Sequence, residues 1–142
     1  MKPIRIALLA LSLGAASCAT VANETLEAPP ILGQLESKTY LACMKKANGR
    51  LEQAPCIQNE KAYQWKQLDL LYKSLAAKLN DGQRQELAKS QAAWKTFMGA
   101  ETAFSVSVYY PQLGSADFSV PTNEIMWIVQ RRQQLQQHLD LN

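Results

Sequence analysis

The sequence predicts an all-α protein, a small antiparallel bundle of about four helices. Apolar residues recur at steps of three and four along most of the chain after residue 35. Helix start and stop signals separate these periodic segments, and three of the connections are short, which favours antiparallel neighbours. The chain has 142 residues, a length that suits one domain.

The clearest helix is predicted for residues 56–80, directly after Pro55, a residue typical of a helix start. Its apolar stripe comprises Trp65, Leu68, Tyr72, Leu75 and Leu79. A shorter first helix is predicted for residues 35–48, where Asn48-Gly49 supplies a stop. We therefore expect two helices to meet near residue 50.

A third helix is predicted from residue 82 to 104, extending toward Tyr109, with Asp81 as its N-cap. Residues 105–121 interrupt the helical period. Their first part alternates polar and apolar residues, as a short strand does. The helical neighbours favour a frayed helix end and an ordered loop instead.

Pro121 is expected to open a fourth helix. Its inward stripe comprises Ile125, Ile128, Val129, Arg132, Leu135 and Leu139. An ion pair between Glu101 and Arg132 is expected to join the third and fourth helices. We expect Trp65 and Trp94 in the core and Trp127 along an exposed groove.

The first 18 residues have the pattern of a secretory signal peptide. A basic segment, Met1–Arg5, precedes the apolar stretch Ile6–Gly14 and the small residues Ala15–Ala19. The apolar stretch is shorter than the roughly 20 residues that span a bilayer. The protein is therefore expected in the periplasm or cell envelope.

Two processing routes are open. Ala15-Ala16-Ser17-Cys18 resembles a bacterial lipobox, in which Cys18 becomes the lipidated first residue of a lipoprotein. Cleavage after Ala19 or Ala22 would instead remove Cys18. Residues 19–34 are expected to form a linker and residues 35–142 the helical domain. Membrane contact is expected only through the lipid anchor.

Cys43 and Cys56 form an even pair, which in an oxidising compartment predicts a structural disulfide. The bond would join the first helix to the start of the second. For a loop of this size the chain-entropy model gives about 3 kcal/mol of stabilisation.

Charge and motifs narrow the function. The formal charge is +3, or 13 basic against 12 acidic residues once Lys2 and Arg5 of the leader are removed. This near-neutral domain does not fit an electrostatic nucleic-acid binder.

His138 is the one histidine, so a multi-histidine metal site within one chain is excluded. We expect no metal and no cofactor. It is expected at a helix C-terminus, where the dipole favours a cation.

Catalytic motifs such as a P-loop, a G-x-S-x-G elbow or H-E-x-x-H do not occur in the sequence. We therefore expect no catalytic residues and no enzyme activity. A small hydrolase of envelope polymers is the least favoured hypothesis, because it needs two or more acids that converge in a pocket. Glu124 and Asp117 are the acids that the sequence offers near Glu101.

Several anchors occur in order between residues 40 and 138 and resemble the LprI-type lysozyme-inhibitor family. A cysteine is followed by a leucine-rich helix, a Gln-x-x-Trp element and a closing Arg-x-x-x-Leu helix, which starts at Arg131 or Arg132. The residues that carry the resemblance are Cys43, Cys56, Glu60, Leu68, Tyr72, Gln91, Trp94, Arg132 and Leu135. Asp69 replaces the family's usual asparagine, and Thr102 stands where members often carry a cysteine.

The resemblance implies a secreted envelope protein that binds and blocks lysozyme. Blocking the cleft most simply needs an inserted loop, and the candidates are Gly49–Pro55, held by the disulfide, and Tyr110–Val120. Within them Arg50, Tyr110 and Ser115 are the candidate contact residues. The alternative is a non-catalytic envelope scaffold lipoprotein that binds peptidoglycan or a protein partner. The lysozyme type and the oligomeric state are left open.

Overall fold

A computed structural model describes residues 36–114 and 118–141, and all its regular elements in these ranges are helices. The helices are α1 (Lys38–Lys46), α2 (Arg50–Lys78), α3 (Asp81–Leu113) and α4 (Ser119–Asp140). The predicted all-α class is confirmed. The predicted signal peptide (residues 1–18) and linker (residues 19–34) lie outside the described residues.

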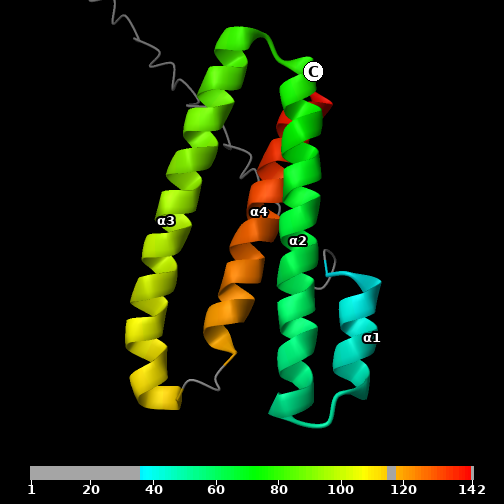
Figure 1. Cartoon of the computed structure of the whole chain (residues 1–142), viewed down its shortest axis with the longest axis vertical. Coiled ribbons are helices and arrows are strands. Elements are labelled where there is room, and N and C mark those ends of the chain that lie inside the picture. The colour runs from blue at the N-terminus through cyan, green and yellow to red at the C-terminus, as the bar shows by residue number, and fades with distance from the viewer. Residues whose placement is uncertain (1–35, 115–117, 142) are drawn as a thin grey trace, which may run out of the picture.

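Three long helices form the body of the bundle, and each runs antiparallel to the one before it (Figure 1). The short helix α1 lies beside the N-terminal half of α2. The principal packing is between α2 and α4, while α3 packs on α4 less extensively. The α1–α2 turn, the end of α3 and the start of α4 lie at the same end of the bundle (Figure 1).

The second helix begins at Arg50, six residues earlier than predicted, so Pro55 lies inside it. Gly49 has a φ of 85°, in the left-handed region that favours glycine. In the first turn of α2, the Glu52 carboxylate accepts a 2.7 Å hydrogen bond from the Asn48 backbone N–H. A negative charge at this end of a helix also interacts favourably with the helix dipole. The predicted loop over residues 49–55 is therefore wrong: most of it is helix.

The third helix runs to Leu113, well past its predicted end, and the ordered loop predicted after residue 104 is wrong over most of its length. Ser105 is buried seven residues after the buried Met98, so the inward face continues at helical spacing. Because the buried Ser105 is polar, the sequence from residue 105 alternates polar and apolar residues as a strand does, although it is helical. The N-cap is Asn80 rather than Asp81, because Asn80 and Gln83 form a reciprocal capping box with bonds of 2.9 and 3.0 Å.

The fourth helix begins at Ser119, and Pro121 lies in its first turn, where the missing N–H removes no helical hydrogen bond. Its predicted stripe is confirmed, with Ile125, Ile128, Val129 and Leu135 buried. Within residues 36–114 and 118–141, none of the helices combines the length and hydropathy that crossing a membrane requires.

The core has two parts. The larger lies among α2, α3 and α4, and its buried residues are Leu68, Leu75, Leu87, Met98, Ile128 and Leu135. The smaller lies where α1 meets α2 and α4, around Ile57, Ile125 and Val129. Trp65 and Trp94 are partly buried against the larger core, as predicted, and Trp127 packs there too rather than along a separate exposed groove.

The predicted disulfide is present between Cys43 on α1 and Cys56 on α2, with a Cα–Cα distance of 5.8 Å. It attaches α1, which has no fully buried residue of its own, to a position where Cys56 is only 2% exposed. The bond therefore supports a helix that hydrophobic burial alone holds weakly.

Replacing Cys43 and Cys56 together by alanine should lower the free energy of unfolding by about 3 kcal/mol, because the loop is no longer closed in the unfolded chain. Urea unfolding followed by circular dichroism measures this. The unmodified protein in reductant should show a similar loss. Equal stability of the variant and the oxidised protein would contradict this role of the bond.

Candidate functional site

The α1–α2 turn, the end of α3 and the start of α4 lie at one end of the molecule, in a surface that we call the bundle end. It comprises Lys45, Lys46, Gly49, Arg50, Leu51, Leu113, Gly114 and Phe118. The Arg50 guanidinium carbon lies 5.9 Å from the centre of the Phe118 ring, so a cation–π contact joins the start of α2 to the start of α4. Leu51 beside it is 93% exposed.

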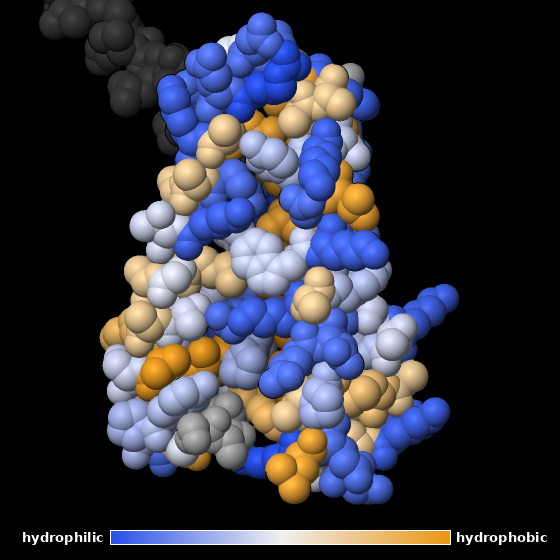
Figure 2. Space-filling model, viewed as in Figure 1, coloured by the Kyte–Doolittle hydropathy of each residue, from blue (hydrophilic) through white to orange (hydrophobic). Residues whose placement is uncertain are grey.

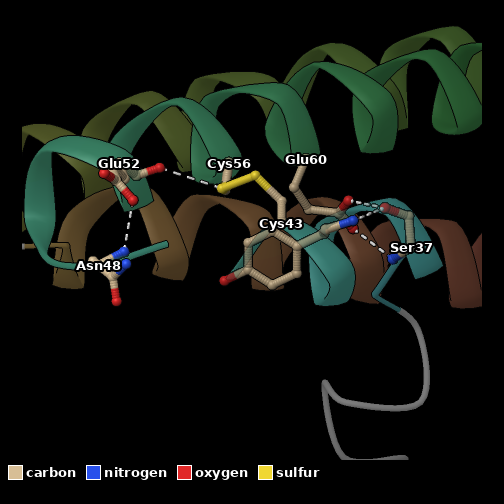
Figure 3. The surroundings of a disulfide bond; sticks show 7 residues. Ser37, Cys43, Asn48, Glu52, Cys56 and Glu60 are labelled. Atoms are coloured by element: carbon tan, nitrogen blue, oxygen red, sulfur yellow. Dashed lines mark hydrogen bonds between the residues drawn. A yellow bond between two sulfur atoms is a disulfide. The ribbon is translucent and has the colours of Figure 1, made fainter. Parts of the chain in front are cut away.

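The bundle end rests on a rigid support. Figure 3 shows the disulfide between two polar contacts, Asn48–Glu52 on one side and Ser37–Glu60 on the other. Asn48 and Glu52 close the turn itself, and the disulfide lies one helical turn further along α2. Arg50 and Leu51 are therefore presented from the first turn of a braced helix.

The charge of this end is mainly positive. Lys45 and Lys46 are exposed in the last turn of α1, and Arg50 is exposed in the first turn of α2. Glu52 is the acid in that first turn, and its carboxylate is engaged by the Asn48 backbone. An anionic group is the natural counterpart of this surface.

The structure places the predicted contact residues differently from the loops that the sequence suggested. Arg50 is helical, and so is Tyr110, which lies half-buried near the end of α3. Ser115 lies outside the described residues. The α1–α2 turn and the α3–α4 junction nevertheless meet at one end, through Arg50 and Phe118.

Behind the disulfide, a buried polar relay connects the residue before α1 to α2 and α4. The Glu60 carboxylate accepts hydrogen bonds from the Ser37 N–H at 3.0 Å and the Ser37 hydroxyl at 2.5 Å. It also accepts a 2.6 Å bond from the Gln64 amide nitrogen. The Gln64 amide oxygen in turn accepts a hydrogen bond from the Arg132 guanidinium. Glu60 is 2% exposed and Gln64 fully buried, so the relay connects a buried carboxylate to a partly buried cation, Arg132.

Burial shifts the titration of the groups around the relay. Desolvation lowers the pKa of Arg132, partly offset by the negative charges of Tyr63 and Glu60. Burial, and secondarily the charge of Glu60, raise the pKa of Glu36. Burial with the charges of Glu36 and Glu60 also raises the pKa of Tyr40. Burial therefore disfavours ionisation of both Glu36 and Tyr40.

The predicted ion pair between Glu101 and Arg132 is not formed, because Arg132 turns toward α2 and Gln64. The interhelical ion pair is instead Lys61–Glu124, between α2 and α4. The Thr102 hydroxyl donates a 3.2 Å hydrogen bond to the same Glu124 carboxylate. The position of Arg132 on its helix did not determine whether its long side chain would reach α2 or α3.

The next residue along α4, Arg131, reaches the opposite way, toward α3. Its Nε donates to the Gln91 amide oxygen at 3.0 Å, and its Nη2 donates to the Ser90 hydroxyl at 2.9 Å. The guanidinium lies 6.0 Å from the centre of the Trp94 ring. Desolvation lowers the pKa of Arg131. Gln91 and Trp94, the Gln-x-x-Trp pair on α3, thus both contact the Arg131 guanidinium.

Between α2 and α3 the surface opens into a cleft of about 320 Å³. It is lined by Trp65, Leu68, Asp69, Tyr72, Ala88, Gln91, Ala92 and Lys95. The Trp65 and Trp94 rings meet edge to face, with 5.6 Å between their centres and 64° between their planes. Figure 2 shows this face, where apolar and polar side chains mix between the two helices.

The remaining predicted chemistry-bearing residues are separate from one another. His138 is exposed in the last turn of α4, as expected. Glu124 is paired with Lys61, and Asp117 lies outside the described residues. Across residues 36–114 and 118–141, no three His, Cys, Asp or Glu side chains gather as metal ligands would.

Residues 43–138 match the sequence profile of the family described as Lysozyme inhibitor LprI. This range covers most of the chain and includes the disulfide, both arginines and the relay residues Glu60, Gln64 and Arg132. The chain belongs to the LprI lysozyme inhibitor family. No curated protein and no solved structure matches the chain.

The LprI signature residues have mainly internal partners here. Glu60 belongs to the relay, Leu68 to the core, and Gln91 and Trp94 to the Arg131 contact. Tyr72 lines the cleft and packs against the core. Arg131 is the arginine that contacts the Gln-x-x-Trp pair, whereas Arg132 completes the relay.

Sequence reasoning missed Ser37, Gln64 and the separate role of Arg131. Gln64 lies four residues after Glu60 and four before Leu68, so it continues the buried face of α2. A polar residue on an otherwise apolar helix face indicates a buried hydrogen bond, and this pattern could have identified Gln64 from the sequence.

Glu60→Ala should lower the free energy of unfolding by about 3 kcal/mol, because it leaves Ser37 and Gln64 without their buried acceptor and removes the negative charge near Arg132. Urea unfolding measures the loss, and Glu86→Ala on the exposed surface of α3 is the control. Glu60→Gln, which keeps an acceptor oxygen, should lose less. A loss below about 0.5 kcal/mol for Glu60→Ala, typical of surface changes, would contradict the relay.

Glu36→Gln should stabilise the protein at neutral pH. The folded pKa of Glu36 is raised above the ordinary 4.5, so its contribution to stability is present at low pH and is lost as the pH rises through the folded pKa. The glutamine variant lacks this loss. Its melting temperature should therefore exceed that of the unmodified protein at pH 7, and the difference should vanish below the ordinary pKa. A pH-independent difference would contradict the assignment.

Proposed function

We propose that this protein inhibits lysozyme outside the cytoplasm by a direct protein–protein contact, without catalysis of its own. The family match supports an inhibitor. The predicted signal peptide supports a location in the periplasm or cell envelope, where Cys18 would carry a lipid anchor. Such an inhibitor needs a rigid surface that fits the partner's cleft.

We assign the contact to the bundle end, and the exposed, braced position of Arg50 and Leu51 is the observation that carries this assignment. Lysozyme cleaves glycans with two carboxyl groups in a cleft. The guanidinium of Arg50 can pair with a carboxylate in the bidentate geometry that arginine favours. Burying Leu51 in the same contact would add roughly 1.5–3 kcal/mol of hydrophobic stabilisation.

Electrostatics restrict how the complex would form. Animal lysozymes are typically basic, and the bundle end is also basic through Lys45, Lys46 and Arg50. Long-range steering therefore does not favour the encounter. The attraction is confined to the carboxylates within the cleft, so affinity depends on close contact rather than on net charge.

An alternative is a non-catalytic envelope scaffold lipoprotein that binds peptidoglycan or another protein. The residues that carry the family resemblance mainly contact interior partners and maintain the fold. They are therefore compatible with a lysozyme inhibitor and with an envelope scaffold. The two functions differ in whether the purified protein slows the lysis of cell walls by lysozyme.

Arg50→Glu should raise the half-inhibitory concentration by about 30-fold, the loss expected for an arginine that anchors an interface. Leu51→Asp should raise it about tenfold, because its apolar contact is lost. The assay is turbidity of a cell-wall suspension with lysozyme and the oxidised protein.

Matched controls lie at the other end of the bundle. Lys78→Glu repeats the charge reversal on the last turn of α2, and Leu141→Asp repeats the apolar change at a residue that is 84% exposed. Both should inhibit like the unmodified protein. Inhibition that survives Arg50→Glu and Leu51→Asp would overturn the assigned surface. No inhibition at micromolar unmodified protein would overturn the proposed function.

A further inference from the structure

The cleft between α2 and α3 is not used by the proposed lysozyme contact. Its lining begins at Trp65, fifteen residues after Arg50 along α2, which is about 22 Å at 1.5 Å per residue. Its volume of about 320 Å³ falls at the lower end of the range of small-molecule sites. The cleft is therefore large enough for a small molecule.

The cleft exists because large residues on α2 face small residues on α3. Trp65 and Tyr72 are seven residues apart, so they lie on one face of α2, two helical turns apart. Opposite them, Ala88 and Ala92 leave the space unfilled. Arg132 holds α4 to α2 and Arg131 holds α4 to α3, so neither contact closes the gap between α2 and α3.

The aromatic side is held in place. Trp65 packs edge to face with Trp94, and Trp94 in turn contacts the Arg131 guanidinium. The Lys95 ammonium lies 6.0 Å from the centre of the Trp65 ring, but Lys95 is exposed and its flexible stem can move aside. A flat apolar surface is thus available at the cleft.

Polar groups surround this aromatic surface. The Tyr72 hydroxyl, the Trp65 indole N–H and the Gln91 amide nitrogen have no hydrogen-bond partner within the described ranges. Gln91 is oriented by its oxygen, which accepts from Arg131, so its two amide hydrogens stay available. The Asp69 carboxylate, paired with Lys73 at 2.7 Å, adds an acceptor.

We propose that this cleft binds a short saccharide. A pyranose ring has an apolar face of C–H groups and a rim of hydroxyls, which matches aromatic side chains bordered by neutral donors and one carboxylate. A phosphate or nucleic-acid ligand would need concentrated positive charge, whereas the lining of the cleft holds one lysine, Lys95, and one carboxylate, Asp69. A purely apolar ligand would leave the unpartnered donors without acceptors.

Ala92→Leu tests the cleft directly. Ala92 is exposed and lines the cleft, so leucine fills the space without entering the core and keeps helix propensity high. Ala93→Leu is the matched control, because Ala93 is also exposed but does not line the cleft. Equal melting temperatures would establish that both variants are folded.

The experiment titrates the purified, oxidised protein with tri-N-acetylchitotriose and, separately, with cellotriose. Binding is followed by the NMR signal of the Trp65 indole N–H, assigned from its loss in Trp65→Phe. We expect a saturable shift with at least one sugar, and a Kd at least tenfold weaker in Ala92→Leu than in Ala93→Leu. Tyr72→Phe, which removes only the hydroxyl, should weaken binding severalfold.

The outcomes separate the possibilities. Binding of both sugars supports recognition of the pyranose face, and binding of tri-N-acetylchitotriose alone supports recognition that includes its acetamido group. No saturable shift with either sugar, or equal binding by Ala92→Leu and Ala93→Leu, overturns the proposal. Because lysozyme is absent from the titration, this result is independent of whether the protein inhibits lysozyme.

Discussion

Two adjacent arginines on α4 are the constraint on which the rest of the bundle depends. Successive helical residues point about 100° apart, so Arg131 reaches α3 and Arg132 reaches α2. Arg131 is buried and Arg132 is partly buried, so both guanidinium groups need acceptors or a compensating charge. Gln91 and Ser90 supply them for one arginine, and Gln64 with the charge of Glu60 supplies them for the other.

This arrangement makes α4 the element that positions both of its long neighbours. Because α2 and α3 are each held to α4, they need not close on one another, and the cleft beside Trp65 remains open. The Glu60 relay extends the same network to Ser37, at the start of α1. The disulfide then ties the end of the network to the bundle end.

The family signature and the proposed functional surfaces are largely different sets of residues. Most of the side chains that carry the family resemblance contact buried partners and so maintain the fold. The bundle end uses Arg50 and Leu51, which lie outside that signature and are constrained by the support beneath them. The cleft draws on both sets, because Tyr72 and Gln91 face it while Gln91 also binds Arg131.

The sequence by itself determined the helical class, the stripes around Leu68 and Ile128, and the pairing of Cys43 with Cys56, because periodicity and cysteine number are local or compositional properties. It misplaced the start of α2, because Pro55 resembled a helix start, and the end of α3, because the buried Ser105 resembled part of a strand or loop. Only the tertiary structure decided that α2 begins beside Phe118 and that Arg131 and Arg132 separate toward different helices. These are choices among neighbours that local spacing leaves open, and packing with hydrogen-bond satisfaction makes them.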